Sequence, residues 1–163
     1  MQRIIDLKKA GKLSRKLRKD GKKIILSGGC FDVLHFGHIK FLEAAKKTGG
    51  ILFVLLESDE NVKKIKGEQR PINNQVERAF VLSSVRSVDY VILMPEVKED
   101  IEYDKIVESI NPSVIAVTKG SGQVEHAKRQ AKNIGSTVLE VIARINDKST
   151  SKIADIISKE NQL

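Results

Sequence analysis

The chain has 163 residues, of which 40% are hydrophobic and 31% charged, proportions that suit one soluble globular domain with a single core. No apolar run approaches the roughly 20 residues that a membrane span needs, and the basic N-terminus lacks the apolar stretch of a secretory signal. The single cysteine, Cys30, excludes an internal disulfide and fits a reducing cytoplasm, while the net charge of +8 suits nucleic acid, a membrane surface or a small anionic substrate.

The first stretch, 1–21, is predicted to be a basic helix that precedes a core spanning 22–163. Most of the excess positive charge lies between Lys8 and Lys23, where a lysine-rich helix face exposed to solvent accounts for it. Trp is absent, aromatic residues make up 4% of the chain, and no helix-turn-helix, RNA-recognition or zinc-finger signature is present. These features argue against a nucleic-acid partner. Because no linker or repeat divides the chain, we predict one domain over 1–163.

Short apolar runs alternate with amphipathic stretches along the rest of the chain. We expect five strands, at 23–26, 51–58, 88–94, 113–118 and 136–142. We expect helices at 38–47, 73–87, 101–110, 123–135 and 151–160. Asn74 and Glu77 are spaced as a capping box. This alternation predicts an α/β fold with three layers, α/β/α, around a parallel five-stranded sheet, and such sheets bind ligands beyond the carboxyl ends of their strands.

One such strand end carries the stretch GGCFDVLHFGH, at 28–38. Its glycines let the backbone turn tightly against a ligand, and the helix that we expect to begin near Phe36 offers free N–H groups to an anion. His35 and His38 lie three apart, so both can donate to phosphate oxygens from one side of the first turn. Two alternatives remain, a pair of helix-capping histidines and a zinc site, although only Asp32 lies nearby as a third metal ligand.

These residues carry a resemblance to a known family. The run GCFDVLHFGH resembles the Gly-x-Phe-Asp-x-x-His-x-Gly-His signature of the cytidylyltransferase-like nucleotidyltransferases. A second stretch, RINDKSTSKI, resembles the arginine and Ser/Thr-rich motif of that family. Over 21–117 the sequence is most similar to the nucleotidyltransferase domain of ADP-heptose synthases. The resemblance implies a Rossmann-like fold, a cytoplasmic enzyme and a homodimer.

The resemblance also implies roles for individual residues. His35 and His38 would contact the triphosphate, together with a lysine from the 63–66 segment, which we expect to be a mobile loop. Lys66 is the first choice for this lysine and Lys64 the second, with an exposed charge run as the alternative. Arg78 would lie near the phosphates, and its alternative is a surface arginine paired with a neighbour such as Glu77.

Further residues are expected at the nucleotide by the same resemblance. They are Gly29, Cys30, Phe31, Asp32, Gly37, Lys119, Gly120, Arg144, Ser149, Thr150 and Ser151. Cys30 is interpreted as a packing residue, with a reactive nucleophile as the alternative. Asp32 would orient its loop or hold Mg²⁺ through water, and Ser149 and Thr150 would hold a phosphate or cap the last helix. The segment 118–122 departs from the Lys-Gly-Gly-Asp-Tyr of heptose-type relatives, so the base and the acceptor stay open.

The implied reaction transfers a nucleoside monophosphate from ATP or CTP to a phosphorylated sugar or alcohol, with release of pyrophosphate. Mg²⁺ is expected with the nucleotide, because its phosphates need their charge neutralised, and no protein metal site or membrane partner is expected. Adenylyl transfer to heptose 1-phosphate is the first hypothesis. The alternatives are a cytidylyltransferase acting on glycerol 3-phosphate or a similar alcohol, a flavin adenylyltransferase of the FAD synthetase type, and a basic nucleic-acid-binding module that has kept only the fold.

Overall fold

In the computed structural model, which describes residues 3–145, six strands form one parallel sheet in the order β1-β4-β3-β2-β5-β6. The strands are β1 (Ile4–Asp6), β2 (Ile24–Gly29), β3 (Ile51–Leu56), β4 (Tyr90–Leu93), β5 (Val114–Lys119) and β6 (Thr137–Ala143). The helices are α1 (Leu7–Lys19), α2 (Phe36–Lys47), α3 (Asp59–Lys66), α4 (Gln75–Ser83), α5 (Asp100–Ile110) and α6 (Gln123–Ile134).

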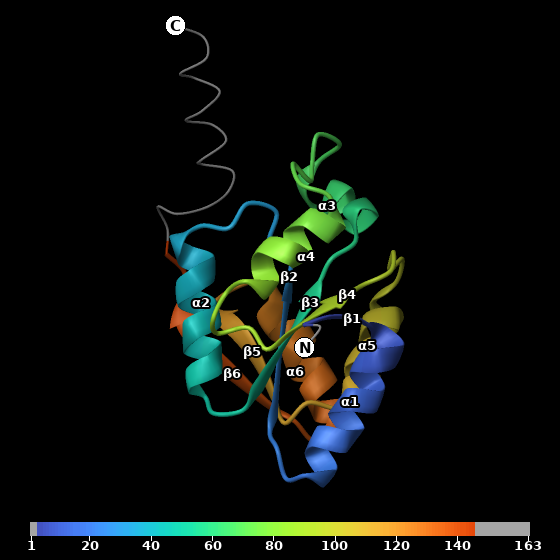
Figure 1. Ribbon diagram of the computed structural model, residues 1–163, viewed down its shortest axis with the longest axis vertical. Coiled ribbons are helices and arrows are strands. Elements are labelled where there is room, and N and C mark those ends of the chain that lie inside the picture. Colours follow the sequence, from blue (N-terminus) through green and yellow to red (C-terminus); the bar gives the residue numbers. More distant parts are fainter. Residues whose placement is uncertain (1–2, 146–163) are drawn as a thin grey trace, which may run out of the picture.

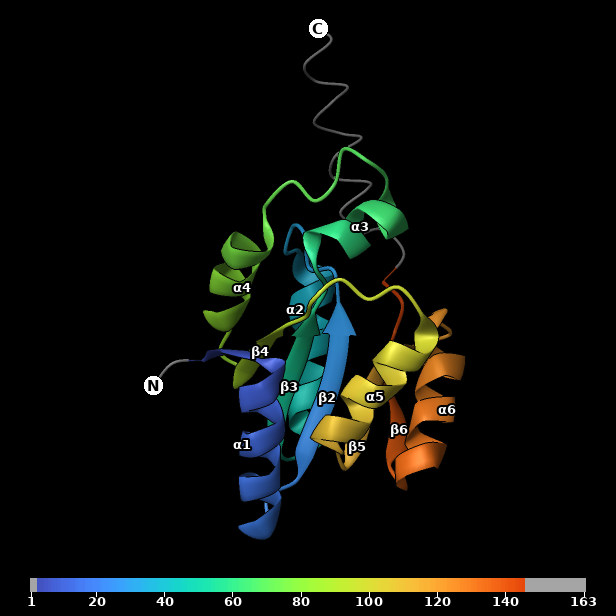
Figure 2. The same ribbon diagram turned by 90° about the vertical axis from the view of Figure 1, so that its right-hand side faces the viewer.

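Helices cover both faces of the sheet, which makes the three expected layers. Helices α2 and α4 lie on one face and α1, α5 and α6 on the other (Figure 1), whereas α3 sits beyond the edge to which the strands point (Figure 2). Along β3, Leu52 and Val54 pack toward α2 and α4, while Phe53 and Leu55 join the core under α1, α5 and α6. A central strand buried on both faces explains why this stretch is apolar without interruption.

The sheet has one more strand than the sequence predicted, so the expectation of five strands is wrong. All five expected strands are present, and the sixth is β1, which pairs with β4 at the edge through Ile4, Ile5 and Asp6. Its three residues are too few to show the alternation of apolar and polar residues that indicates a strand in a sequence. The stretch 1–21 therefore adds a strand to the sheet as well as its basic helix α1, and Ile5 is buried in the same core as the central strands.

The expected helix ends are largely confirmed. Asn74 and Glu77 form a capping box on α4, α5 stops at Asn111, and Gly135 closes α6 with a φ of 69°. The 63–66 segment, however, is helical rather than a loop, because Ser58 caps α3 and acidic residues begin it. The helix expected at 151–160 lies outside the described residues. No described helix is long and apolar enough to cross a membrane.

Candidate active site

A cavity of about 800 Å³ opens at the carboxyl ends of the strands. Its walls come from the 28–38 loop, the end of α3, the residues that follow β5 and β6, and the facing sides of α5 and α6. Figure 2 shows these segments gathered at the edge to which β2 and β3 point. This is the place where parallel sheets bind ligands, because loops from several strands meet there.

The loop after β2 brings its backbone close to an aromatic ring. Phe31 adopts a φ of 42°, is buried, and lies with its ring centre 5.1 Å from that of His38. A side chain at Gly29 would place its Cβ 3.0 Å from the Phe31 ring, so this position favours glycine. Gly29, Cys30, Phe31, Asp32 and Gly37, which the resemblance named as nucleotide-binding candidates, all line the cavity.

His35 and His38 stack against each other at the start of α2, with ring centres 3.8 Å apart and planes inclined by 26°. His35 caps the helix, since its Nδ1 accepts a hydrogen bond of 3.1 Å from the Gly37 amide, which leaves the proton on Nε2 when the ring is neutral. Both rings line the cavity. The capping alternative and the phosphate-binding hypothesis are therefore compatible, because a capping ring can still donate from its other nitrogen.

Burial keeps both imidazoles neutral near pH 7. Desolvation lowers the pKa of His35, and it lowers the pKa of His38 to about 4, helped by the neighbouring His35 and Lys66 and opposed by a backbone hydrogen bond with Val33. A neutral imidazole donates one N–H rather than two. The pair is thus an uncharged hydrogen-bonding surface, and the positive charge at the cavity comes from other residues.

Four cationic side chains line the same cavity: Lys66 at the end of α3, Arg70 in the loop that follows, Arg129 on α6 and Arg144 just after β6. Of these, Arg129 is paired with Asp100 and Asp104. Lys66 reaches the cavity from an exposed position. Lys64 does not line the cavity, because it points to the other side of α3 and forms an ion pair of 2.7 Å with Glu96. Between the two candidate lysines, the structure places the first choice at the site.

Asp32 organises the loop that carries Arg70. Its buried carboxylate accepts hydrogen bonds from the Arg70 Nε, from the Ile72 amide at 2.8 Å and from the Asn73 amide at 3.2 Å. Of the two roles considered for this residue, its contacts are those of loop orientation. Arg70 was not singled out in the sequence, and it enters the site through this ion pair.

Arg78 lies behind the cavity wall rather than in it. Its side chain is fully buried and donates to the carbonyl oxygens of Cys30 (2.5 Å), Glu57 (2.8 Å) and Asn73 (3.0 Å) and to the Asp59 carboxylate (2.7 Å). The expected surface pair with Glu77 is also absent among the described residues, since the Glu77 carboxylate bonds the Asn74 amide. Arg78 therefore ties together the backbone around the site.

The thiol of Cys30 is held in its protonated form. Burial raises its pKa, and the negative charge of Glu57 raises it further. Because the thiolate is the reactive species, this environment favours the packing role over the nucleophile.

The wall formed by β5 and β6 is only partly described. Gly120 has a φ of 66°, lines the cavity and donates its amide to Glu140 at 3.1 Å. Lys119 is exposed and does not line the cavity. Ser149, Thr150 and Ser151 lie outside the described residues, so their expected roles stay predictions. Within 3–145, no three His, Cys, Asp or Glu side chains gather to hold a metal ion.

Three residues missed by the sequence analysis form a hydrogen-bonded group on the opposite wall. Glu57 and Tyr103 line the cavity, and the buried Asn61 bridges them. Glu57 directly follows the apolar run of β3, so the rule that ligands gather at strand ends could have singled it out. Tyr103 gave no such signal, because it reaches the site only through the packing of α5.

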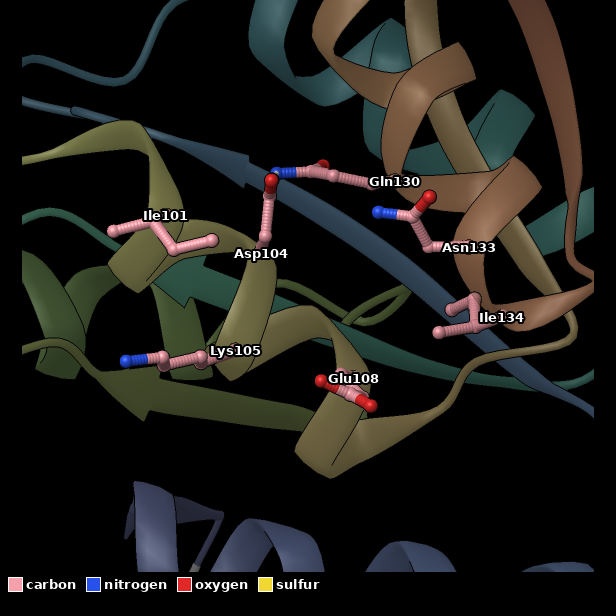
Figure 3. A pocket seen from close by; sticks show the side chains of 7 residues that line it. All are labelled: Ile101, Asp104, Lys105, Glu108, Gln130, Asn133 and Ile134. Carbon is pink, nitrogen blue, oxygen red and sulfur yellow. Dashed lines mark hydrogen bonds between the residues drawn. The ribbon is translucent and has the colours of Figure 1, made fainter.

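A second, smaller groove lies between α5 and α6 and has a volume of about 420 Å³. Figure 3 shows Asp104 and Gln130 pointing toward each other across it, and these side chains are hydrogen-bonded at 3.1 Å. Asp104 also pairs with Arg129 at 3.0 Å. Asp104 and Gln130 therefore serve contacts between the two helices, and the cavity at the strand ends is the candidate site.

Comparison with known proteins identifies the family. The Cytidylyltransferase-like family matches residues 26–161, most of the chain. The chain belongs to this family, and it is a nucleotidyltransferase.

Its sequence is 42% identical over 140 residues to bifunctional protein HldE of Aliarcobacter butzleri and 37% identical over 152 residues to that of a Nitratiruptor species. These alignments cover 86% and 93% of the chain but 28% and 31% of the relatives, so the chain spans less than a third of their length. They confirm the resemblance to ADP-heptose synthase that the sequence carries.

Two solved structures share the fold. A lipopolysaccharide core biosynthesis protein from Thermoplasma volcanium is 29% identical, with a TM-score of 0.59 over 77% of this chain and 97% of that one. Pantoate-beta-alanine ligase from Francisella tularensis is 15% identical, with a TM-score of 0.63 over 99% of this chain and 79% of that one. The second likeness shows the fold alone, and both agree with a Rossmann-like fold.

Proposed function

We propose that the chain transfers a nucleoside monophosphate from a nucleoside triphosphate to a phosphorylated sugar and releases pyrophosphate, and that the specific reaction is adenylyl transfer to heptose 1-phosphate. The observation that carries this proposal is the convergence of stacked neutral His35 and His38 with Lys66, Arg70 and Arg144 on one cavity. The HldE relatives and the lipopolysaccharide-related structure support the choice of sugar.

The chemistry asks for positioning and charge stabilisation rather than a general base. The phosphate of the acceptor is already an anion at pH 7, so one of its oxygens can attack the α-phosphorus while the bond to pyrophosphate breaks. His35 would donate its Nε2–H to a phosphate oxygen as charge builds on it. The single N–H of neutral His38 bonds the Val33 backbone, so His38 would donate its second N–H when the bound triphosphate favours the imidazolium. Lys66 and Arg70 would stabilise the leaving pyrophosphate, and Arg144 would bind a phosphate as well.

Mg²⁺ would arrive with the triphosphate and neutralise part of its charge. Oxygen ligands suit this ion, but the Asp32 carboxylate is occupied by Arg70 and two backbone amides, which leaves the nucleotide phosphates as its main ligands. Asp32 and Arg78 would act as positioning residues, since both hold the loops that carry the contacts.

A pyrophosphate-release screen tests the proposal. The four nucleoside triphosphates are each combined with heptose 1-phosphate, glycerol 3-phosphate and flavin mononucleotide in the presence of Mg²⁺. We expect release only with ATP and heptose 1-phosphate together, and a loss of about 10²–10³ in rate for His38→Ala. Release with CTP and glycerol 3-phosphate would support the cytidylyltransferase instead. An absence of release with every pair, with tight and salt-sensitive binding to nucleic acid, would support the binding module.

A further inference from the structure

The wall of the cavity opposite the histidines carries a fixed acidic group, Glu57. We propose that the Glu57 carboxylate accepts hydrogen bonds from hydroxyl groups of the acceptor sugar, and that Asn61 and Tyr103 are positioning residues that aim it. This inference rests on the proposed function, which requires an acceptor but does not say which residues select it. It names the specificity-determining group of the acceptor side of the site.

The backbone at Glu57 is fixed from two directions. Its amide donates to the Gly29 carbonyl at 3.2 Å, which joins it to the glycine loop after β2. Its own carbonyl accepts from the Arg78 guanidinium at 2.8 Å. The side chain therefore starts from a rigid point beside the phosphate-binding loop, and rigid support is what a specificity contact requires.

The carboxylate itself is held by a closed triangle of hydrogen bonds. The Tyr103 hydroxyl donates to Glu57 Oε2 at 2.9 Å, and the Asn61 amide donates to the same oxygen at 3.1 Å. Asn61 Nδ2 also donates to the Tyr103 oxygen at 2.9 Å, while its Oδ1 accepts from the Val97 amide at 3.2 Å. Every donor of the triangle has an assigned acceptor, so the carboxylate is held in one orientation.

One oxygen of this carboxylate is left for a ligand. Both donors of the triangle reach Oε2, and among residues 3–145 no hydrogen bond is made to Oε1. Glu57 lines the cavity, so Oε1 belongs to a group that a bound molecule can reach. A free carboxylate oxygen on a cavity wall is an acceptor for hydroxyl or amine donors.

The negative charge on Glu57 determines which chemical groups of a ligand can lie beside it. Phosphate is repelled by a carboxylate, whereas the hydroxyls of a sugar can donate to it. The two side chains that bond the carboxylate carry no charge of their own, because Asn61 is an amide and Tyr103 is a neutral phenol whose pKa is raised by burial and by Glu57. The phosphates are thereby confined to the end of the cavity with Lys66 and Arg70.

The order of strands assigns this wall to the acceptor rather than to the nucleoside. Glu57 follows β3, which lies on one side of β2, while β5 and β6 lie on the other. The β5 and β6 side of the cavity combines the apolar Ile115, Val117 and Ile142 with polar side chains such as Thr118 and Ser121. Apolar surface with a few polar groups suits a flat base. With the reacting phosphates above β2, the two substrates extend in opposite directions, and the sugar meets Glu57.

Kinetics of Glu57→Gln test this assignment. Pyrophosphate release by the wild-type chain comes first, because its absence with every substrate pair refutes the proposed function whatever Glu57 does. If the wild type is active, we expect Glu57→Gln to raise KM for the sugar phosphate by about tenfold to a hundredfold, the value of a hydrogen bond to a charged acceptor. KM for the triphosphate should change by less than about threefold, since its contacts lie on the other wall.

The matched control is Glu60→Gln, which removes the same charge from an exposed position on α3 that does not line the cavity. It should leave both KM values unchanged. Tyr103→Phe removes a single donor to Glu57, so KM for the sugar phosphate alone should rise by about threefold to tenfold. This second variant keeps the ring and its packing, and it tests the proposal even if Glu57→Gln does not fold.

Deoxy analogues of the sugar phosphate give an independent readout. The wild type should bind at least one analogue about tenfold more weakly than the full sugar, and Glu57→Gln should lose that discrimination. Equal discrimination by both enzymes would overturn the inference while leaving the proposed function intact. A rise in KM for the triphosphate in place of the sugar would also overturn it, since the carboxylate would then contact the ribose.

Discussion

At the scale of single residues, His38 combines two requirements that oppose each other. In the proposed reaction it meets a highly charged triphosphate, yet its ring is packed between Phe31 and His35, where a positive charge is poorly solvated. Burial therefore lowers the pKa of His38 to about 4 and keeps the ring neutral near pH 7. The ring then donates one hydrogen bond without carrying its own charge. Its burial also makes the folded chain less stable at acidic pH.

We predict that His38 makes the chain less stable as the pH falls from about 6.5 to about 4. In that window the unfolded chain binds a proton at His38 and the folded chain does not, so the free energy of unfolding decreases with decreasing pH. Between pH 7.5 and pH 5 the loss should be about 2 kcal/mol. Urea denaturation of the wild type and of His38→Gln at both pH values measures it.

The control for this experiment is His126→Gln, which removes an exposed histidine of α6. In His38→Gln, the difference in the free energy of unfolding between the two pH values should be about 2 kcal/mol smaller than in the wild type. His126→Gln should keep the wild-type difference. A wild-type pH dependence in His38→Gln would show that the ring is not desolvated in the folded chain.

The sequence located the residues whose role depends on the local backbone. His35, His38 and Gly29 lie within one turn between a strand and a helix, so their spacing alone put them at the cavity wall. Arg78 and Glu57 differ, because their positions depend on which way a side chain points after distant segments pack. Arg78 turned inward to bind three carbonyls, and no local pattern specifies those partners.

At the scale of elements, Arg78 connects four segments that build the site. From α4 it bonds the backbone after β2, the backbone after β3, the loop before α4 and the first turn of α3. Removing it leaves several buried acceptors without donors, which costs more than the loss of one hydrogen bond. The cavity wall and the fold are thus supported by the same guanidinium.

We predict that Arg78→Met lowers the free energy of unfolding by about 3–5 kcal/mol, as measured by urea denaturation. Arg78→Lys should fall between this variant and the wild type, because an ammonium cannot reach all four acceptors. The matched control is Arg86→Met on the exposed side of the loop after α4, which should change stability by less than about 0.5 kcal/mol. Equal losses in Arg78→Met and Arg86→Met would contradict the bridging role.

Two elements, β1 and α3, were not predicted from the sequence, and each was missed for a physical reason. Strand β1 gains its order from pairing with β4, which is about 85 residues away and leaves no trace in three residues of sequence. Helix α3 is also short and carries lysines that resemble an exposed loop, yet Ser58 at its start was a readable cap. By contrast, β2 to β5 were predictable because each is a longer run that contains buried apolar residues, and β6 showed an alternating apolar pattern.

At the scale of the whole molecule, the cavity collects charged groups from distant segments. Basic groups from α3, its following loop and the end of β6 line it, and so does the acidic Glu57 after β3. A triphosphate with its Mg²⁺ would therefore settle against Lys66, Arg70 and Arg144 and bridge segments that are far apart in the sequence. Such a ligand binds only the folded chain and so stabilises it by mass action.

We predict that ATP with Mg²⁺ raises the melting temperature, and that Lys66 carries part of this shift while Lys64 does not. At a hundred times Kd the stabilisation is about 2.7 kcal/mol, which corresponds to roughly 5–10 °C for a chain of this size. Lys66→Ala should remove about half of the shift, as a tenfold loss of affinity is about 1.4 kcal/mol. The measurement is a thermal melt with and without nucleotide.

Lys64→Ala is the matched control, since it removes the same charge two residues away on the same helix, where the ammonium pairs with Glu96 outside the cavity. Its shift should equal that of the wild type. If both variants lost the shift equally, the basic end of α3 would act through its overall charge rather than through one directed contact. A larger shift with CTP than with ATP would transfer the adenine assignment to cytosine and leave the contribution of Lys66 unchanged, because the lysine meets phosphates that both nucleotides share.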